Sequence, residues 1–288
     1  MSKLSPSLKA LVSAAFARPN TLPASPQIRT VYERLRQQAA AKHVGLPAWL
    51  TLSTAATVTM NSPEALAQLY NLATSSSKDK AQSVQTAELM REVGLKCMGL
   101  NGIPRTINCL GAFRASLPND IVSSLSTKPT RVPSVDNINT ITTRGHNLWK
   151  SIYNPFDEKL VAKLAESHPD LPVFILNHGY GALFSDPAEL GHASGAKVGR
   201  VLTSIAAVAC LRAQTGVGPQ VTSHIFGLRK AFEDGTYKAP GEFEVEGGEW
   251  LATDDGNIWI LKSVDSIVEA LSEGTGTTFA PGTVKSNL

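Results

Sequence analysis

Two segments of the chain are apolar on almost every face, and they constrain the fold more than any other feature. They are residues 197–214, KVGRVLTSIAAVACLRAQ, and residues 47–60, PAWLTLSTAATVTM. A helix without a polar face must be covered on all sides by other elements. Neither segment reaches the roughly 18 consecutive apolar residues of a membrane-spanning helix. The chain is therefore predicted to be an all-α protein built around buried helices.

Further helices follow from capping and breaking signals. Ser25 and Ser62 each precede a proline that is tolerated in a first helical turn, which predicts helices at about 26–43 and 63–73. A longer helix is expected from Asp79 to about Leu100, then a turn at NGIP and a second helix that ends before Pro118. Near the C-terminus, EWLATDDGNIWILK consists of two apolar runs around Asp-Asp-Gly, which predicts a small β-hairpin followed by a short helix.

These patterns divide the chain into five parts. Two prolines and no helical period mark a linker between two helical regions. The predicted parts are an N-terminal tail (1–24), a first helical unit (25–125), the linker (126–141), a second helical unit (142–238) and a C-terminal extension (239–288).

Composition excludes several classes of function. The 27 basic and 24 acidic residues leave a net charge of +3, which favours neither nucleic acid nor an anionic membrane as a partner. The three cysteines form no Cys-x-x-Cys pair and are odd in number, as is typical of a reducing compartment. His and Cys residues lack metal-ligand spacing, so we expect no metal. The glycine-rich stretches GVGPQ and GTGTT follow no predicted strand, so we also expect no cofactor.

The two helical units share an internal pattern. Each contains a cysteine near the end of a long helix, a Gly/Pro turn and a second helix, in CMGLNGIPRTINCLGAFRA and CLRAQTGVGPQVTSHIFGLRKA. Seven residues separate Asn108 from Ala115 and His224 from Ala231, and the glycine and basic residue between them fall in the same register. This register predicts a diverged duplication of one helical hairpin.

At this hairpin the chain resembles the carboxymuconolactone decarboxylase and alkylhydroperoxidase D (AhpD) superfamily, in particular a fungal branch with two units in tandem. The resemblance is strongest over residues 199–231 and 95–114. It implies an all-helical AhpD-like fold, a homo-oligomer formed through the hairpin helices, and a site at the hairpin histidine.

The motif departs from the peroxidase branch of that superfamily. The resemblance places a Cys-x-x-Cys pair where this chain has Val217 and Gln220, and a glutamate where it has Ile205. A peroxidase of that type needs one thiolate to attack the hydroperoxide and a second thiol to resolve the sulfenic acid. Cys210 lies fourteen residues before His224, across the turn. Disulfide-cycling peroxidase activity is therefore not expected.

The decarboxylase branch implies a histidine that moves a proton, without thiols. His224 would be the general acid or base. Gln220, one turn earlier, would contact it or the substrate, and Arg212 or Arg229 would hold a carboxylate. The sequence therefore predicts a lyase-like enzyme that acts on a small carboxylate, lactone or acyl compound.

The first unit holds the complementary residues. Glu92 lies sixteen residues before Asn108, which occupies the place of His224. One hypothesis is that the two hairpins pack about a pseudo-twofold axis, so that Glu92 and Arg105 complete a site with His224. The alternative is that Glu92 makes an ordinary ion pair on a helix.

Two other classes of function remain open. A redox protein would use Cys97, Cys109 or Cys210 in a different geometry, and a non-catalytic protein would bind a ligand or act as a scaffold.

The two ends of the chain carry possible addresses. Ser286, Asn287 and Leu288 differ from the peroxisomal Ser-Lys-Leu signal only at the middle residue, which predicts a peroxisomal import receptor as partner. Residues 1–32 are basic and contain no acid, as in a mitochondrial transit peptide. The mitochondrial matrix and the cytosol are the alternatives to the peroxisome.

Overall fold

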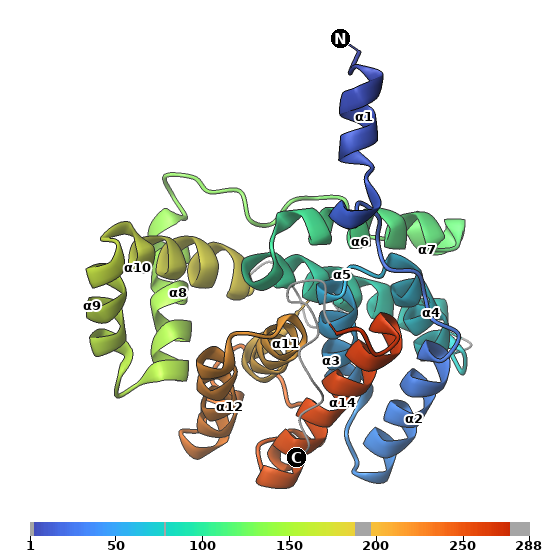
Figure 1. Ribbon diagram of the computed structural model, residues 1–288. Helices are drawn as coiled ribbons and strands as arrows, with labels where there is room; N and C mark the ends of the chain where they lie inside the picture. Colours follow the sequence, from blue (N-terminus) through green and yellow to red (C-terminus); the bar gives the residue numbers. More distant parts are fainter. Residues whose placement is uncertain (1–2, 78, 188–196, 277–288) are drawn as a thin grey trace.

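The computed structural model describes residues 3–77, 79–187 and 197–276, and the regular structure of this part is entirely helical (Figure 1). The all-α prediction is confirmed. The tail carries α1 (Pro6–Val12) and the 3₁₀-helix η1 (Ala15–Ala17). The first half then contains α2 (Ile28–Ala41), α3 (Leu46–Thr59), α4 (Pro63–Thr74), α5 (Lys80–Asn101), α6 (Ile103–Ser116) and α7 (Asn119–Val122).

The second half begins after a stretch without helix. Its helices are α8 (Ile138–Tyr153), α9 (Asp157–Ser167), α10 (Asp170–Phe174), the π-helix η2 (Ile175–Phe184), α11 (Gly199–Gln214), α12 (Gly218–Glu233), the 3₁₀-helix η4 (Thr236–Lys238), α13 (Gly248–Leu251) and α14 (Asp254–Ser272). The predicted linker 126–141 therefore ends earlier than expected, because α8 begins at Ile138.

The two apolar segments form the centre of the molecule, as predicted. Every residue of α3 from Ala48 to Thr59 is buried, and so is every residue of α11 from Arg200 to Leu211. The two helices pack against each other, with α5 and α14 on both of them. One continuous hydrophobic core therefore takes side chains from both halves of the chain.

Two helical hairpins contribute helices to this centre. Helices α5 and α6 pack together after a turn at Gly102, whose φ of 92° favours glycine. Helices α11 and α12 pack together after Thr215 and Gly216, which also have positive φ. Because α5 also packs on α11, the two hairpins are in direct contact.

A separate layer covers α12. Helices α8, α9, α10 and η2 stand together at the left of Figure 1 around a small core of Trp149, Ile152, Leu176 and Tyr180. Helix α8 packs on both η2 and α12. The approach to η2 is very close, since a Cβ on Gly145 would lie 2.6 Å from backbone atoms of Gly181.

The predicted C-terminal β-hairpin is wrong, because residues 248–272 form α13 and α14 instead. Asp254 and Asp255 lie in the first turn of α14, where carboxylates interact favourably with the helix dipole. The Thr253 side chain accepts a hydrogen bond from the amide of Gly256 and caps the helix. The Asp-Asp-Gly sequence is thus a helix start, and the predicted last helix is the second half of α14.

The two ends of the chain differ in how much of them is described. Helix α1 has no buried residue and projects from the body in Figure 1. The peroxisomal-type tripeptide 286–288 lies outside the described residues.

We expect Gly145→Ala to lower the free energy of unfolding by about 1–3 kcal/mol, because the new methyl group would push α8 away from η2. Gly111→Ala on α6 is the matched control, since a Cβ there meets nothing within 4 Å. That control should be neutral or stabilising by up to about 1 kcal/mol. Urea denaturation measures both, and equal stability of the two variants would contradict the close packing of α8 on η2.

Candidate functional site

His224 is buried on α12 at the end of a chain of hydroxyl groups. Its side chain faces α8, and the residue is 7% exposed. The Tyr153 hydroxyl on α8 lies 3.4 Å from His224 Nε2 and 2.9 Å from the Tyr180 hydroxyl on η2. His224 Nδ1 is buried without a hydrogen-bond partner. The three side chains form a buried path along which a proton can pass, and one ring nitrogen is left unused.

Arg200 supplies a positive charge beside this path. The guanidinium is buried near the start of α11 and makes four hydrogen bonds. It donates to Ser151 Oγ at 2.9 Å, to Ser204 Oγ at 2.6 Å, and to the carbonyls of Ser151 and Gly227 at 3.1 and 2.7 Å. These bonds join α8, α11 and α12 around one cation.

Burial and this cation decide the protonation of the site. Loss of solvent, followed by the charge of Arg200, lowers the pKa of His224 to about 4. Burial lowers the pKa of Arg200 to about 10, so the guanidinium still carries its charge at neutral pH. Burial raises the pKa of Tyr153 and Tyr180. At pH 7 the path therefore consists of a neutral imidazole and two neutral phenols.

A cavity of about 530 Å³ has Arg200 in its wall. It is bounded by α8, the residues after η2, the start of α11 and the segment after η4. Its cationic lining residues are Arg144, Lys197 and Arg200, and its acidic ones are Asp186 and Glu242. Arg144 Nε is buried without a hydrogen-bond partner. Ser151 and Arg200 belong both to the cavity wall and to the surroundings of His224, which itself is not among the lining residues.

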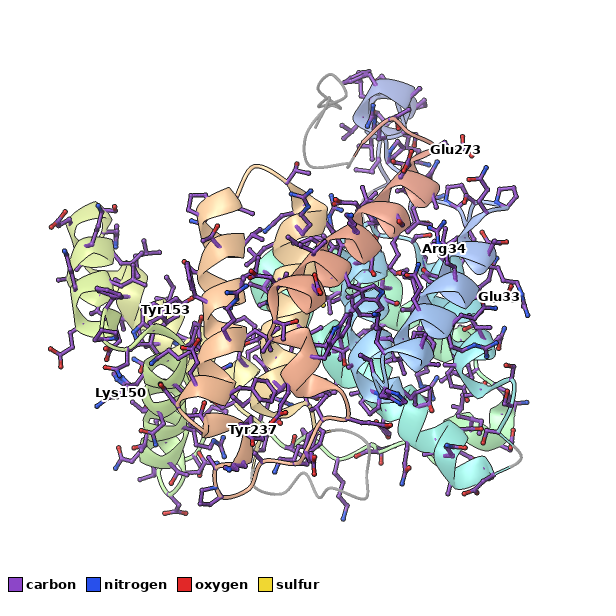
Figure 2. All side chains as sticks on the ribbon, turned by 90° about the horizontal axis from the view of Figure 1, so that it is seen from below. Glu33, Arg34, Lys150, Tyr153, Tyr237 and Glu273 are labelled. Carbon is purple, nitrogen blue, oxygen red and sulfur yellow. The ribbon has the colours of Figure 1, made fainter. Side chains whose placement is uncertain are left out.

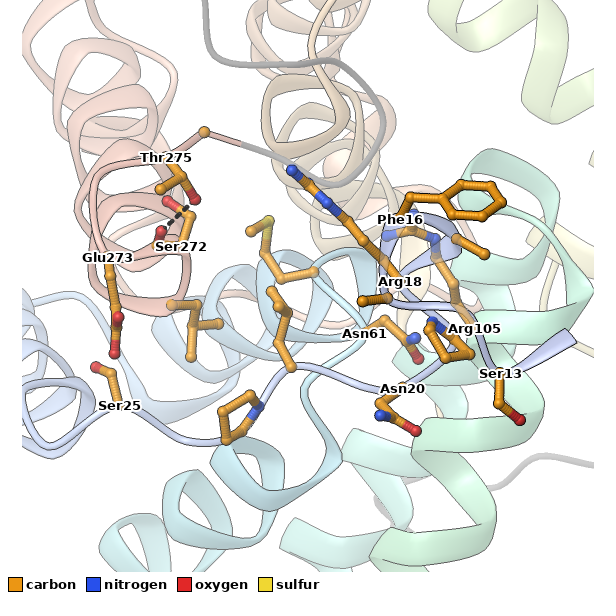
Figure 3. Close-up of a pocket in the computed structure, with 18 residues that line it drawn as sticks. Ser13, Phe16, Arg18, Asn20, Ser25, Asn61, Arg105, Ser272, Glu273 and Thr275 are labelled. Carbon is orange, nitrogen blue, oxygen red and sulfur yellow. Dashed lines mark hydrogen bonds between the residues drawn. The ribbon is translucent and has the colours of Figure 1, made fainter. Parts of the chain in front are cut away.

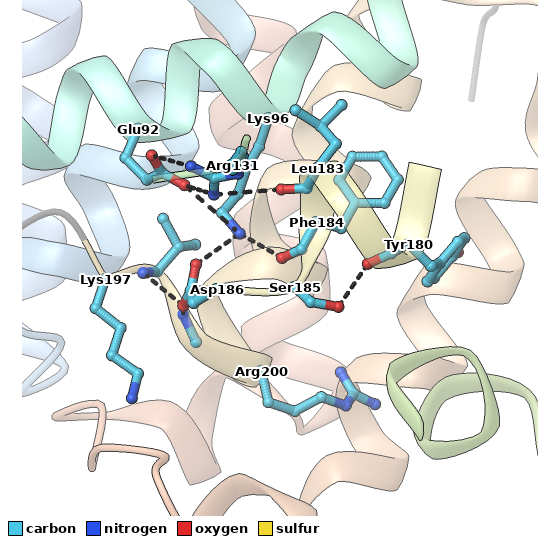
Figure 4. Close-up of polar contacts among 12 residues, drawn as sticks. Glu92, Lys96, Arg131, Tyr180, Leu183, Phe184, Ser185, Asp186, Lys197 and Arg200 are labelled. Atoms are coloured by element: carbon cyan, nitrogen blue, oxygen red, sulfur yellow. Dashed lines mark hydrogen bonds and ion pairs between the residues drawn. The ribbon is translucent and has the colours of Figure 1, made fainter. Parts of the chain in front are cut away.

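Glu92 lies in a second buried cluster (Figure 4), together with Lys96, Arg131 and Asp186. Lys96 Nζ lies 2.7 Å from Asp186 Oδ1 and 3.8 Å from Glu92 Oε1, and Arg131 pairs with Glu92. Asp186 also accepts hydrogen bonds from the amides of Val198 and Gly199. The cluster therefore holds α5, the linker and the start of α11 together.

Asp186 remains charged in this cluster. Burial by itself would raise its pKa, but the attraction and hydrogen bond of Lys96 outweigh burial and hold the pKa below its usual value. A carboxylate that is fixed by a lysine and two backbone amides has a structural role.

The structure does not bring the predicted residues together in one site. No described contact joins Glu92 or Arg105 to His224, as the hypothesis of a composite site required. Glu92 instead pairs with Lys96 and Arg131. Arg105 donates to the carbonyl of Thr59 and lines another cavity, of about 1050 Å³, between residues 13–25 and the end of α14 (Figure 3).

The other candidate residues face the surface. Arg212 makes two hydrogen bonds of 2.8 Å to Asp265, and Arg229 pairs with Asp254. Both carboxylates come from α14. Asn108 is exposed and donates to Asn61 at 3.2 Å, and Gln220 is exposed.

The predicted site residues did not include Tyr153, Tyr180, Arg144 or Arg200. For Arg200 a signal existed, because it is the only charged residue between Val198 and Leu211, in a helix expected to be buried. A charge buried there needs a set of hydrogen-bond partners, which marks a polar site. The two tyrosines carry no such signal, since aromatic residues at these positions are compatible with ordinary packing.

Residues 3–77, 79–187 and 197–276 contain neither a group of metal-binding side chains nor a membrane-spanning helix. Within these ranges, His, Cys, Asp and Glu side chains do not gather in threes where a metal ion would fit. In the same part of the chain no helix has the length and apolarity needed to span a bilayer.

One curated protein resembles this chain in sequence. Over 162 residues the chain is 31% identical to "Peroxisomal protein 2" of Saccharomyces cerevisiae. The aligned region covers 50% of this chain and 54% of the yeast protein. The chain thus matches only about half the length of this relative. No family model matches the chain. No solved structure matches it.

We expect stability to fall as the pH is lowered through the range between the unfolded pKa of His224, about 6.5, and its folded pKa of about 4. The unfolded chain takes up a proton at His224 in this range and the folded chain does not, so acid favours unfolding. The loss from this residue between pH 7.5 and pH 5 should be about 2 kcal/mol.

Urea denaturation at both pH values measures this loss. The control is His224→Gln, which keeps a polar side chain but cannot titrate. The two proteins should differ in their pH dependence by that amount, and an identical dependence would show that His224 is not buried in its neutral form.

Proposed function

We propose that this chain is a carboxymuconolactone decarboxylase-like, AhpD-like protein that carries out thiol-independent acid/base chemistry on a small carboxylate, lactone or acyl compound. One observation carries the proposal: Arg200 and Ser151, in the wall of a cavity lined by cations, also lie beside the buried path of Tyr180, Tyr153 and His224. The charge of the cavity supports the proposed substrate class, and the hydroxyl path supports the proposed acid/base chemistry.

The arrangement of the hairpins supports membership of the superfamily. Helices α5 and α11, which end in the two related turns, pack against each other. Cys97 and Cys210, which hold related places in the repeated pattern, have sulfur atoms 3.3 Å apart. Exposed Ile107 on α6 and Phe226 on α12 support the oligomerisation through hairpin helices that the resemblance implies.

The cavity supports an anionic ligand of modest size. Arg144 brings a buried Nε without a partner, and a guanidinium that binds a carboxylate through two nitrogens is one of the strongest hydrogen-bonded pairs in proteins. Lys197 adds a second positive charge at the wall. Burial, followed by the nearby charge of Asp186, raises the pKa of Glu242, although nearby cations act against the rise. A ligand with one carboxylate and a second polar group matches these walls.

The hydroxyl path supports proton transfer. A proton that a substrate group delivers to Tyr180 can pass through Tyr153 to Nε2 of neutral His224, so that both phenols are neutral before and after the transfer. A histidinium beside Arg200 would be unfavourable, so a proton that reaches His224 is readily given back. Arg200 is a positioning residue in this scheme, because its hydrogen bonds to α8, α11 and α12 are all within the protein.

A second candidate is a ligand-binding protein without catalysis. It is favoured by the position of His224, which is behind the cavity wall and not part of it. Both candidates predict carboxylate binding, and only the enzyme predicts turnover.

The test uses a panel of small carboxylates and lactones, with binding followed by thermal shift and turnover by NMR in D₂O. Arg144→Gln should weaken binding by about tenfold or more, because it removes a charge-assisted hydrogen bond. Tyr153→Phe should retain binding and slow turnover by about 100-fold.

The matched control is Arg34→Gln, on the opposite side of the molecule from Tyr153 (Figure 2), which should change neither property. Unchanged binding in Arg144→Gln would contradict the proposed cavity. Binding without turnover in the unmodified protein would favour the non-catalytic candidate.

We also propose a peroxisomal location, supported by the name of the yeast relative and by the peroxisomal-type tripeptide 286–288. A fluorescent protein fused to the N-terminus should colocalise with a peroxisomal marker, and deletion of residues 286–288 should disperse it. Asn287→Lys, which restores Ser-Lys-Leu, should keep or strengthen the colocalisation. A fusion that stays diffuse in both forms would contradict the proposal.

A further inference from the structure

Two of the three cysteines meet in the centre of the molecule. Cys97 on α5 and Cys210 on α11 are both fully buried, and their Sγ atoms are 3.3 Å apart. Each sulfur is thus in direct contact with the other, although 113 positions separate the two residues in the chain. Cys109 on α6 is also buried, and its thiol lies 3.9 Å from the carbonyl oxygen of Val58.

The packing around the pair allows a closer approach. Cys210 has the small, buried Ala209 and Ala213 near it on its own helix, and its sulfur lies 3.8 Å from the carbonyl oxygen of Ala55 on α3. A disulfide has an S–S distance of about 2.05 Å. The sulfurs therefore need to approach by little more than about 1 Å, which side-chain rotation and a small helix shift can provide.

We propose that Cys97 and Cys210 are a redox-active dithiol that a small hydroperoxide oxidises to an intrachain disulfide. One thiol, as its thiolate, attacks the peroxide oxygen and becomes a sulfenic acid, while the peroxide leaves as an alcohol or water. The second sulfur then attacks the sulfenic sulfur, the S–S bond forms and water leaves. Two thiols lose two electrons and two protons, and the hydroperoxide is reduced to one alcohol and one water. An external dithiol restores the pair by thiol–disulfide exchange.

The environment makes this a slow, stoichiometric reaction. The hydrogen bond to Cys210, followed by burial, raises the pKa of the Cys97 thiol well above its usual value, so little thiolate is present at neutral pH. Slow oxidation fits a lasting covalent link better than it fits peroxide turnover. The link would join α5 to α11, and hence the two hairpins. This inference is independent of the acid/base function proposed for the cavity.

The experiment exposes the full-length protein to millimolar hydrogen peroxide for increasing times. The protein is then unfolded, alkylated with N-ethylmaleimide and weighed intact by mass spectrometry. We expect the number of alkylated cysteines to fall from three to one. A digest under non-reducing conditions should contain the peptides of Cys97 and Cys210 joined by a disulfide. Dithiothreitol should return three alkylated cysteines.

Matched variants assign the bond to this pair. Cys109→Ser should still form it, with the number of alkylated cysteines falling from two to none. Cys210→Ala should keep both of its remaining thiols, and circular dichroism confirms that it is folded. Three alkylated cysteines after prolonged exposure, a disulfide that includes Cys109, or sulfinic acid at Cys97 without a disulfide would each overturn the proposal. The digest of the unmodified protein decides the question even if a variant does not fold.

Discussion

The buried guanidinium of Arg200 is the interaction on which the arrangement of the second half depends. A cation in an apolar core is costly unless its donors are satisfied, and here they bind groups on three helices. These hydrogen bonds therefore fix the positions of α8 and α12 along the axis of α11. Burial, followed by this charge, lowers the pKa of His224 and keeps it neutral at pH 7. The guanidinium also forms part of the cavity wall. One residue thus links the packing of the layer to the chemistry of the proposed site.

The π-helix η2 connects this cation to the second buried cluster. Tyr180 on η2 joins the path to His224, while the carbonyl of Phe184, at its end, accepts a hydrogen bond from Lys96 (Figure 4). Asp186, two residues later, pairs with Lys96 and holds the first turn of α11. A shift of η2 would disturb both the hydroxyl path to His224 and the ion-pair cluster around Lys96. The close contact of η2 with Gly145 on α8 limits such a shift.

The sequence predicts the central helices well, because a helix that is apolar on every face must be buried on all sides. It predicts the site poorly, and one error explains much of this. The prediction of a β-hairpin at residues 249–262 replaced the first half of α14, which carries Asp254. Asp254 pairs with Arg229, which was therefore left as an apparent carboxylate-binding residue. Arg212 pairs with Asp265 on the second half of α14, a partner that sequence spacing alone does not reveal. Arg200 was missed because Ser151 and Gly227, which accept its hydrogen bonds, come from segments that local patterns cannot bring together.

The two copies of the proposed duplication differ in what covers them. Gly227 on α12 packs against Ile152 of α8, whereas a Cβ on its counterpart Gly111 would meet open space. His224 is accordingly buried beneath α8, while Asn108 in the same register is exposed. Burial lowers the histidine pKa, and the covering layer supplies both tyrosines of the proton path. The hairpin alone therefore does not make a site: the chemistry proposed for the second copy depends on the layer of α8 and η2, and none of the described residues forms such a layer over Gly111.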